Sequence, residues 1–162
     1  MKLKSKYFLL GIVLTITMGC LGQGNTVSEQ PQVTTRILFV LDASRSMSGK
    51  WQGESKYTIA RNILSDILDS IKQVPNVEVA LRVYGHTKNF PPQDCNDTRL
   101  EVPFSKDNVD QIKYRLKQLG PKGTSPIANS LLKTKDDFTD CENCRNIVVL
   151  ITDGIEECGG DI

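Results

Sequence analysis

Histidine is nearly absent from this sequence, and its scarcity excludes several kinds of site. The 162 residues include a single histidine, His86, so a metal centre built from several histidines cannot form. The nucleophile motif G-x-S-x-G does not occur, and His86 has no evident serine or cysteine partner. The residues present therefore give no support to a hydrolase that uses a serine or cysteine nucleophile.

A strong excess of charge is also missing. The chain carries 20 Lys and Arg against 19 Asp and Glu, a formal net charge of +1. Three of the lysines, Lys2, Lys4 and Lys6, stand at the start of the chain, and without them 17 basic residues face 19 acidic ones. This balance does not indicate a nucleic-acid surface, and no nucleic-acid partner is expected.

Long hydrophobic runs and internal repeats are absent as well. The apolar run "YFLLGIVLTITM" near the N-terminus is too short for a comfortable membrane-spanning helix. Together with its basic start, it makes residues 1–19 an expected export signal. The remaining composition, within a chain that is 39% hydrophobic and 24% charged, predicts one globular domain over residues 35–162.

The end of the export signal points to anchoring at a membrane. "TMGC" resembles the lipobox of prokaryotic lipoproteins, in which the cysteine, here Cys20, is lipidated and becomes the new N-terminus. Thr17 stands where that motif usually has Leu, and simple secretion or an uncleaved anchor are the alternatives. Residues 20–34 are rich in Gly, Gln, Ser, Thr and Pro and are expected to form a flexible tether. The protein is thus predicted to be exported, as a membrane-anchored or cell-surface lipoprotein or else as a secreted protein.

Four cysteines remain if Cys20 is used for lipidation: Cys95, Cys141, Cys144 and Cys158. An even number of cysteines in an exported chain favours disulfides, and three pairings are open. We favour Cys141 with Cys144 and Cys95 with Cys158. The alternative is a zinc site, because "CENC" has the spacing of zinc ligands, although Cys95 and Cys158 are scattered.

Apolar patterns predict strands that alternate with helices. Short apolar or alternating runs predict strands, and apolar residues at 3-4 spacing predict helices. The expected strands are 36–41, 77–84, 98–104 and "NIVVLITDG" (146–154). The first and last are expected to be covered on both faces, and 98–104 is expected to be an edge strand because of Pro103. The expected helices are 55–72, 109–119 and one that begins near 124–126. This alternation predicts an α/β fold with an open, mostly parallel sheet and helices on both faces.

Oxygen-bearing side chains follow these strands. Asp42, Ser44 and Ser46 come directly after the first strand, and Asp153 follows the last one. Thr124 lies at a junction between a loop and a helix. Ligands of open α/β sheets bind at the carboxyl ends of the strands, so these side chains are candidates for one site. Two carboxylates with three hydroxyls, without sulfur or imidazole, suit Mg²⁺ or Mn²⁺.

The charge of this candidate set suggests its use. At most two negative charges would face a divalent cation, which would then keep electrophilic character and an open coordination position. A carboxylate of a protein partner is the expected ligand for that position.

The set of motifs resembles a known site. Asp42-x-Ser44-x-Ser46, then Thr124, then Thr152-Asp153-Gly154 after an apolar strand are similar to the metal-ion-dependent adhesion site (MIDAS) of von Willebrand factor type A (VWA) domains. The resemblance covers residues 35–162, and "VYGH" and "TDGIEECGGD" are similar to exported prokaryotic members. It implies a Rossmann-like fold in which these five side chains hold the metal, some of them through water.

One departure from the family concerns the C-terminus. Domains of this family normally continue after the last strand seen here with further helices and two more strands. We therefore expect a C-terminally incomplete domain, with the 146–154 strand as an apolar edge prone to aggregation. A thermal melt that compares this chain with an extended version would test the expected loss of stability.

Other residues near the motifs have alternative roles. Arg45, His86, Asp97 and Glu156 are candidates for the outer shell or rim of the site. For His86 a structural hydrogen bond is the alternative, and for the charged residues it is simple solvation. Thr124 or Ser125 is expected to cap the helix that starts there, with Pro126 in its first turn.

The residues are compatible with three functions. The preferred one is a non-enzymatic exported module that captures an acidic residue of a partner through Mg²⁺. The alternative is a structural or assembly scaffold that needs no metal. A Mg²⁺-dependent phosphatase of the aspartyl-phosphate type is disfavoured, because such enzymes usually carry a second carboxylate two residues after the nucleophilic Asp, where this chain has Ser44.

Overall fold

The computed structural model describes residues 32–160 of the chain. The predicted export signal 1–19, the predicted lipidation residue Cys20 and most of the predicted tether lie outside the described residues. Within residues 32–160, no helix is both long enough and apolar enough to cross a membrane.

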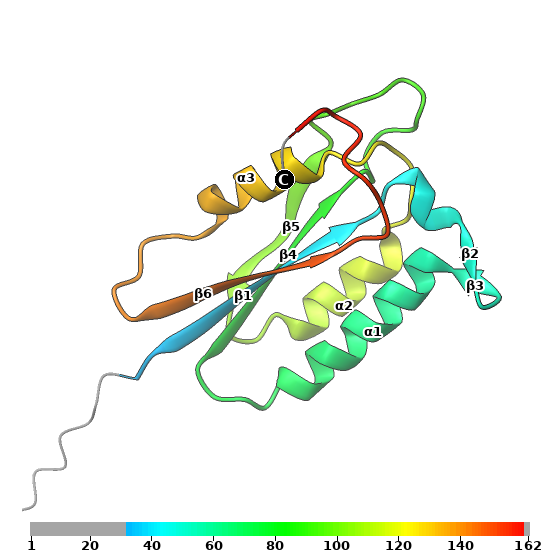
Figure 1. Cartoon of the computed structure of the whole chain (residues 1–162). Helices are drawn as coiled ribbons and strands as arrows, with labels where there is room; N and C mark the ends of the chain where they lie inside the picture. The colour runs from blue at the N-terminus through cyan, green and yellow to red at the C-terminus, as the bar shows by residue number, and fades with distance from the viewer. Residues whose placement is uncertain (1–31, 161–162) are drawn as a thin grey trace, which may run out of the picture.

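A four-stranded, mostly parallel sheet forms the centre of the molecule (Figure 1). Its order is β5-β4-β1-β6, with β5 antiparallel to β4 and all other neighbours parallel. The strands are β1 (Thr34–Asp42), β4 (Val77–Tyr84), β5 (Thr98–Ser105) and β6 (Cys144–Ile151). The apolar run of β1 explains its place between two parallel neighbours, because such a strand must be covered on both faces.

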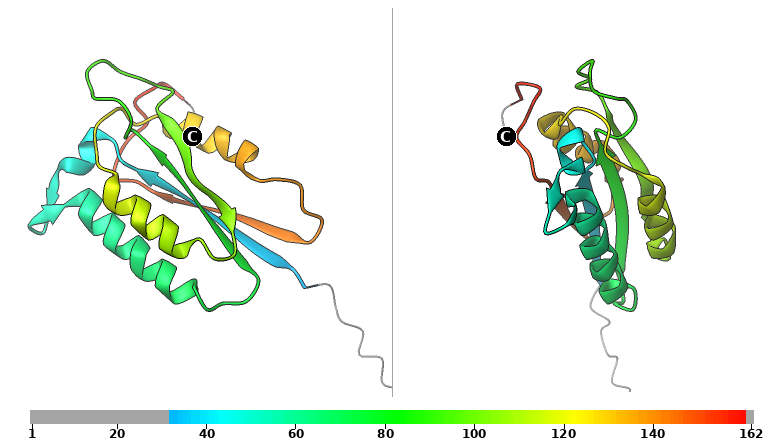
Figure 2. Two further views of the ribbon diagram at one scale, coloured as in Figure 1. Left: turned by 180° about the vertical axis from the view of Figure 1, so that it is seen from behind. Right: turned by 90° about the vertical axis from the view of Figure 1, so that its right-hand side faces the viewer.

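Helices cover both faces of this sheet, as Figures 1 and 2 show. They are α1 (Lys56–Ile71), α2 (Val109–Gln118) and α3 (Ile127–Asp137). Successive side chains of a strand point to opposite faces. Phe39 and Leu41 of β1 accordingly belong to the core under α1 and α2, whereas Leu38 and Val40 belong to the core under α3. The predicted α/β Rossmann-like class is confirmed.

The start of α3 differs from the prediction. The helix begins at Ile127 with Pro126 at the N-cap position, and no side-chain cap bond is present. The backbone N–H of Ala128 instead donates to a carboxylate oxygen of Glu156 at 2.8 Å, from a distant loop. The prediction that Thr124 or Ser125 caps this helix is therefore wrong, because the acidic loop that follows β6 supplies the acceptor.

A short hairpin before α1 was not predicted. β2 (Lys50–Trp51) pairs with β3 (Glu54–Ser55) in antiparallel fashion. Gln52 and Gly53 between them have positive φ angles of 52° and 94°, as tight hairpin turns require. Ser55 then caps α1, since its side chain accepts a hydrogen bond from the Thr58 N–H at 3.1 Å.

The last strand is less covered than its sequence suggests. β6 pairs only with β1 among the described strands, so it forms an edge of the sheet. Ile147 and Val148 are 37% and 40% exposed. The predicted edge position of this strand is confirmed. The prediction that it is covered on both faces is wrong, because the described helices pack mainly over β1, β4 and β5 and leave its side chains partly open. The edge position of β5, predicted from Pro103, is confirmed.

Candidate functional site

The parallel pairing of β1 and β6 sets the position of the candidate site. Leu41 lies opposite Ile151 in the register, so both strands end at the same edge of the sheet. Asp42 is the last residue of β1, and Asp153 follows the end of β6 by two residues. The two carboxylates, far apart in sequence, thus start from neighbouring points of the backbone.

A chain of hydrogen-bonded oxygens connects three of the predicted ligands. Ser44 Oγ lies 3.0 Å from Ser46 Oγ. Ser46 Oγ in turn donates to Asp153 Oδ1 at 2.8 Å. The structure therefore gathers these three side chains, as expected from the strand ends, whereas their role as metal ligands stays a prediction.

Asp42 is fully buried and has neutral partners only. Its Oδ1 accepts from the Ser44 N–H at 2.7 Å, and its Oδ2 accepts from Thr152 Oγ1 at 2.8 Å. The residue is 0% exposed, and no lysine, arginine or histidine within residues 32–160 forms an ion pair with it. Buried charges in proteins are normally paired or bound to metals. Among residues 32–160, the contacts of Asp42 are therefore hydrogen bonds from neutral groups only.

Gly154 borders a small space lined by oxygens. A Cβ atom placed on this glycine would lie 3.6 Å from Ser125 Oγ and 3.7 Å from both Asp42 Oδ2 and Ser46 Oγ. Hydroxyl and carboxylate oxygens from two segments of the chain, 42–46 and 124–125, thus lie around Gly154. A set of oxygen donors of this kind fits a hard cation such as Mg²⁺.

The hydroxyl of Thr124 has a different partner from the other predicted ligands. Thr124 Oγ1 accepts a hydrogen bond from the Asp94 N–H at 3.1 Å, and the residue is 1% exposed. The segment that contains Thr124 lies beside the loop of Ser44 and Ser46, because the Arg45 N–H donates to the Gly123 carbonyl at 2.8 Å. A hydroxyl keeps one donor and a second lone pair, so this bond leaves Thr124 capacity for a further partner.

Gly85 makes the close approach of these segments possible. Its φ angle is +68°, and an added Cβ would lie 2.5 Å from the Thr124 carbonyl and 2.7 Å from Ser44 Cα. Such distances are far below van der Waals contact, so a side chain at this position would push the two loops apart.

The hydroxyl of Tyr84 is a buried hydrogen-bond donor near the candidate site. Its hydroxyl is buried and has no hydrogen-bond partner among the described residues. Burial, and after it the negative charge of Asp42, raises the pKa of this hydroxyl, which therefore stays protonated. The Tyr84 hydroxyl is thus a protonated donor close to Asp42 and Thr152.

The predicted outer residues make other contacts. His86 Nε2 lies 2.7 Å from Glu101 Oε1 of β5, and because a carboxylate only accepts, this nitrogen donates. Burial lowers the pKa of His86, with the Glu101 hydrogen bond as the opposing influence. Asp97 accepts from the N–H groups of Thr87 and Lys88 and so shapes the loop after β4.

Arg45 and Glu156 also serve local structure. The Arg45 guanidinium lies 5.9 Å from the ring centroid of Phe90, a cation–π distance. Glu156 accepts from the Ala128 N–H of α3 and from the Cys158 N–H in its own loop. Among the described residues, neither side chain is bonded to the oxygens of the candidate site.

The four cysteines form two disulfides, Cys95 with Cys158 and Cys141 with Cys144, the pairing that we favoured. The first joins the loop after β6 to the loop after β4, and the second lies at the opposite end of β6. The cysteines are thus not gathered around one ion, and the zinc alternative is not supported.

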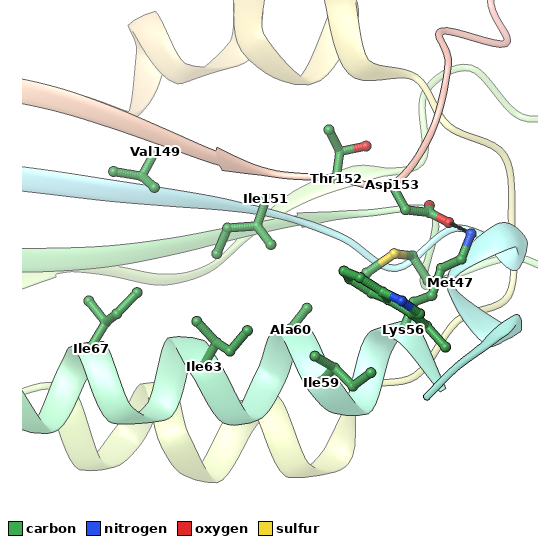
Figure 3. Close-up of a pocket in the computed structure, with 11 residues that line it drawn as sticks. Met47, Lys56, Ile59, Ala60, Ile63, Ile67, Val149, Ile151, Thr152 and Asp153 are labelled. Carbon is green, nitrogen blue, oxygen red and sulfur yellow. Dashed lines mark hydrogen bonds and ion pairs between the residues drawn. The ribbon is translucent and has the colours of Figure 1, made fainter. Parts of the chain in front are cut away.

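Sequence reasoning missed Lys56, which forms an ion pair with Asp153 through Oδ2 (Figure 3). It belongs to no motif, and 97 residues separate the partners. Two carboxylates and one lysine give the site a net negative charge. Within residues 32–160 no cluster of three or more His, Cys, Asp or Glu is placed to hold a metal.

Fold and site together define a class of protein. It is an α/β domain with an open, mostly parallel sheet whose carboxyl edge gathers aspartates and hydroxyls from separate segments. The model of the von Willebrand factor type A domain matches residues 37–156, and the chain belongs to that family. It is also 30% identical to the uncharacterized protein YwmD of Bacillus subtilis (strain 168) over 161 residues, or 96% of this chain and 70% of YwmD.

Solved structures share the fold. The three N-terminal domains of the type V pili tip protein Mfa5 from Porphyromonas gingivalis match with a TM-score of 0.62 and 18% identity, over 76% of this chain and 20% of that one. The PilB minor pilin from Streptococcus sanguinis matches with a TM-score of 0.63 and 22% identity, over 78% of this chain and 31% of that one. The chain thus spans less than a third of either pilus protein.

Proposed function

We propose that this protein is an exported, non-enzymatic binding module that captures a carboxylate of a partner protein through Mg²⁺. Asp42, Ser44, Ser46 and Asp153 would hold the ion, with Thr124 as the fifth ligand. When bound, the ion supplies an open coordination position for an acidic side chain. The chain's own residues orient these oxygens and bury Asp42.

The observation that carries the proposal is the buried carboxylate of Asp42, which has only neutral partners among the described residues. A divalent cation would compensate this charge, whereas a purely structural turn would not need a buried carboxylate. The pilus tip protein and the minor pilin that share the fold support a role in adhesion or assembly.

Two disulfides support the exported location, because such bonds persist in oxidising compartments. Anchoring through a lipid on Cys20 completes the proposal: the domain would then act at the outer surface of a membrane, connected by the 20–34 tether.

Calorimetric titration of Mn²⁺ into the full chain tests the proposal. We expect saturable binding in the parent and none in Asp42→Asn, which keeps the shape of the side chain and removes its charge. Asp136→Asn is the matched control, since the Asp136 side chain is 73% exposed on α3 and should bind no ion specifically. No binding to a folded parent, shown by circular dichroism, would refute the metal-dependent function.

A metal-blind scaffold is the second candidate, and the ion pair between Lys56 and Asp153 favours it. The lysine already neutralises one carboxylate, so the loops can remain in place without metal. Equal melting temperatures of the parent in Mg²⁺ and in EDTA, together with no calorimetric signal, would favour this scaffold role.

A further inference from the structure

Lys56 occupies the outer oxygen of Asp153. Asp153 Oδ1 accepts from Ser46. Its Oδ2 is bonded to the Lys56 ammonium, as Figure 3 shows. The Lys56 side chain is 36% exposed and that of Asp153 is 14% exposed. One of the two carboxylates of the candidate metal site thus already carries a cation supplied by the protein itself.

The backbone places this lysine. Lys56 is the first residue of α1, and its N–H donates to the Gly49 carbonyl at 2.9 Å, which closes the β2–β3 hairpin. A Cβ added at Gly49 would lie 3.6 Å from Lys56 Cε, so the lysine side chain runs close along this glycine. The hairpin and the helix start therefore aim the ammonium at the site.

Helix electrostatics do not explain a lysine at this position. The N-terminal end of a helix carries partial positive charge and favours acidic residues, so a lysine in the first turn of α1 is unfavourable by itself. The contact with Asp153 offsets this cost. The position is thus better explained by the site than by the helix.

We propose that Lys56 is a built-in competitor of the divalent cation at this site. Lys56 is bonded to Asp153 Oδ2 while no metal is present, and this bond must break when a metal binds. The lysine therefore lowers the affinity of the site for the metal. This inference rests on the proposed metal-dependent function and names a residue that regulates it.

Charge explains the competition. Asp42 and Asp153 together carry two negative charges, of which Lys56 neutralises one. A divalent cation that joins the set would lie close to the ammonium and be repelled by it. Removal of the ammonium removes both the repulsion and the need to break its ion pair.

The test compares Mn²⁺ affinities of full-length variants by calorimetry. We expect Lys56→Met to bind Mn²⁺ about fivefold more tightly than the parent, the scale of a partly exposed ion pair of about 1 kcal/mol. Lys50→Met is the matched control: it removes the same charge from the hairpin that precedes Lys56, and Lys50 forms no ion pair within residues 32–160. Its affinity should stay within about twofold of the parent. Lys56→Arg, which keeps the charge, should bind as weakly as the parent.

Thermal melts give a second readout. In EDTA, Lys56→Met should melt below the parent, because Asp153 loses its counter-ion. Saturating Mn²⁺ should then raise its melting temperature more than that of the parent, since tighter binding stabilises the native state further. Equal Mn²⁺ affinities of Lys56→Met, Lys50→Met and the parent would overturn the inference while the proposed function stands. If none of the three folded proteins binds Mn²⁺, both fail.

Discussion

Two carboxylate clusters, one around Glu101 of β5 and one formed by Asp42 and Asp153, differ in their charge balance. Glu101 of β5 contacts three basic side chains, His86, Arg99 and Arg115. Asp42 and Asp153 together contact one, Lys56. The first cluster is compensated within the protein and is structural. The second is left with excess negative charge, which is the property that a cation site requires.

The pKa of Glu101 reflects this compensation. Burial alone would raise it, but the hydrogen bonds from Arg99, Arg115 and His86 outweigh burial and lower the pKa of the carboxyl below its ordinary value. Glu101 is therefore ionised and paired at neutral pH. Its partners come from the loop after β4, from β5 itself and from α2, so this single carboxylate connects three segments.

Gly85→Ala should have the largest effect, because Gly85 lies between the two clusters. The new Cβ would meet the backbone of Thr124 and Ser44 at 2.5–2.7 Å at a φ of +68°. We expect the free energy of unfolding to fall by about 3 kcal/mol or more, measured by urea denaturation.

Gly53→Ala is the control for backbone strain alone. Gly53 has a φ of +94° with no atom within 4 Å of an added Cβ, so the loss should be only about 1 kcal/mol. Equal losses in the two variants would contradict the close approach of the loops at Gly85.

Glu101→Gln should rank second. The amide keeps the shape of the side chain but removes the charge that three basic groups share, and two of these groups keep their charge at neutral pH. We expect a loss of about 2 kcal/mol in urea denaturation and an unchanged affinity for Mn²⁺. A fall in Mn²⁺ affinity would show that the two clusters are not independent.

Asp42→Asn should change stability least among these substitutions in EDTA. The Asp42 charge has no cation partner among the described residues, so its removal relieves the cost of burying a charge. The substitution also weakens the two hydrogen bonds that the carboxylate accepts, which offsets this gain. We expect a change of less than about 1 kcal/mol by urea denaturation. A loss as large as that of Glu101→Gln would mean that the Asp42 charge is already compensated.

The pH dependence of stability should be the smallest effect. His86 has a pKa below its ordinary 6.5, so the unfolded chain takes up protons first as the pH falls through 6.5, and stability decreases. The lowered pKa of Glu101 has the same sign, with stability lost as the pH falls below 4.5. As the pH is lowered from 8 to 4, the melting temperature should decrease in these two pH ranges. His86→Gln should abolish the upper one, and a persisting decrease there would assign it to another group.

Part of the site could be predicted, because its residues lie where strands end and the sequence pattern reveals those ends. The apolar run before Asp42 fixed β1, and the parallel pairing with β6 brings Asp153 to the same edge. The alternate spacing of Ser44 and Ser46 then sufficed to predict their convergence. These inferences depend only on local pattern and on the general geometry of α/β sheets.

The remaining part depends on contacts that no local pattern encodes. Lys56 reaches Asp153 only because a two-residue turn at Gln52 and Gly53 reverses the chain. Thr124 bonds to the Asp94 N–H, and the start of α3 receives its acceptor from Glu156, each from a loop distant in sequence. The exposure of β6 likewise depends on which elements pack over it.

The disulfide between Cys95 and Cys158 makes the order of the loop after β6 depend on oxidation of the chain. Cys158 lies five residues after Asp153, and its bond spans 63 residues. A cross-link of this length restricts the unfolded chain strongly and holds the loop after β6 against the loop after β4. In a reducing compartment the same loop would be held only by weaker contacts such as that from Gln93 to the Glu157 carbonyl. We therefore expect a newly made chain to order the loop after Asp153 fully only once this disulfide has formed.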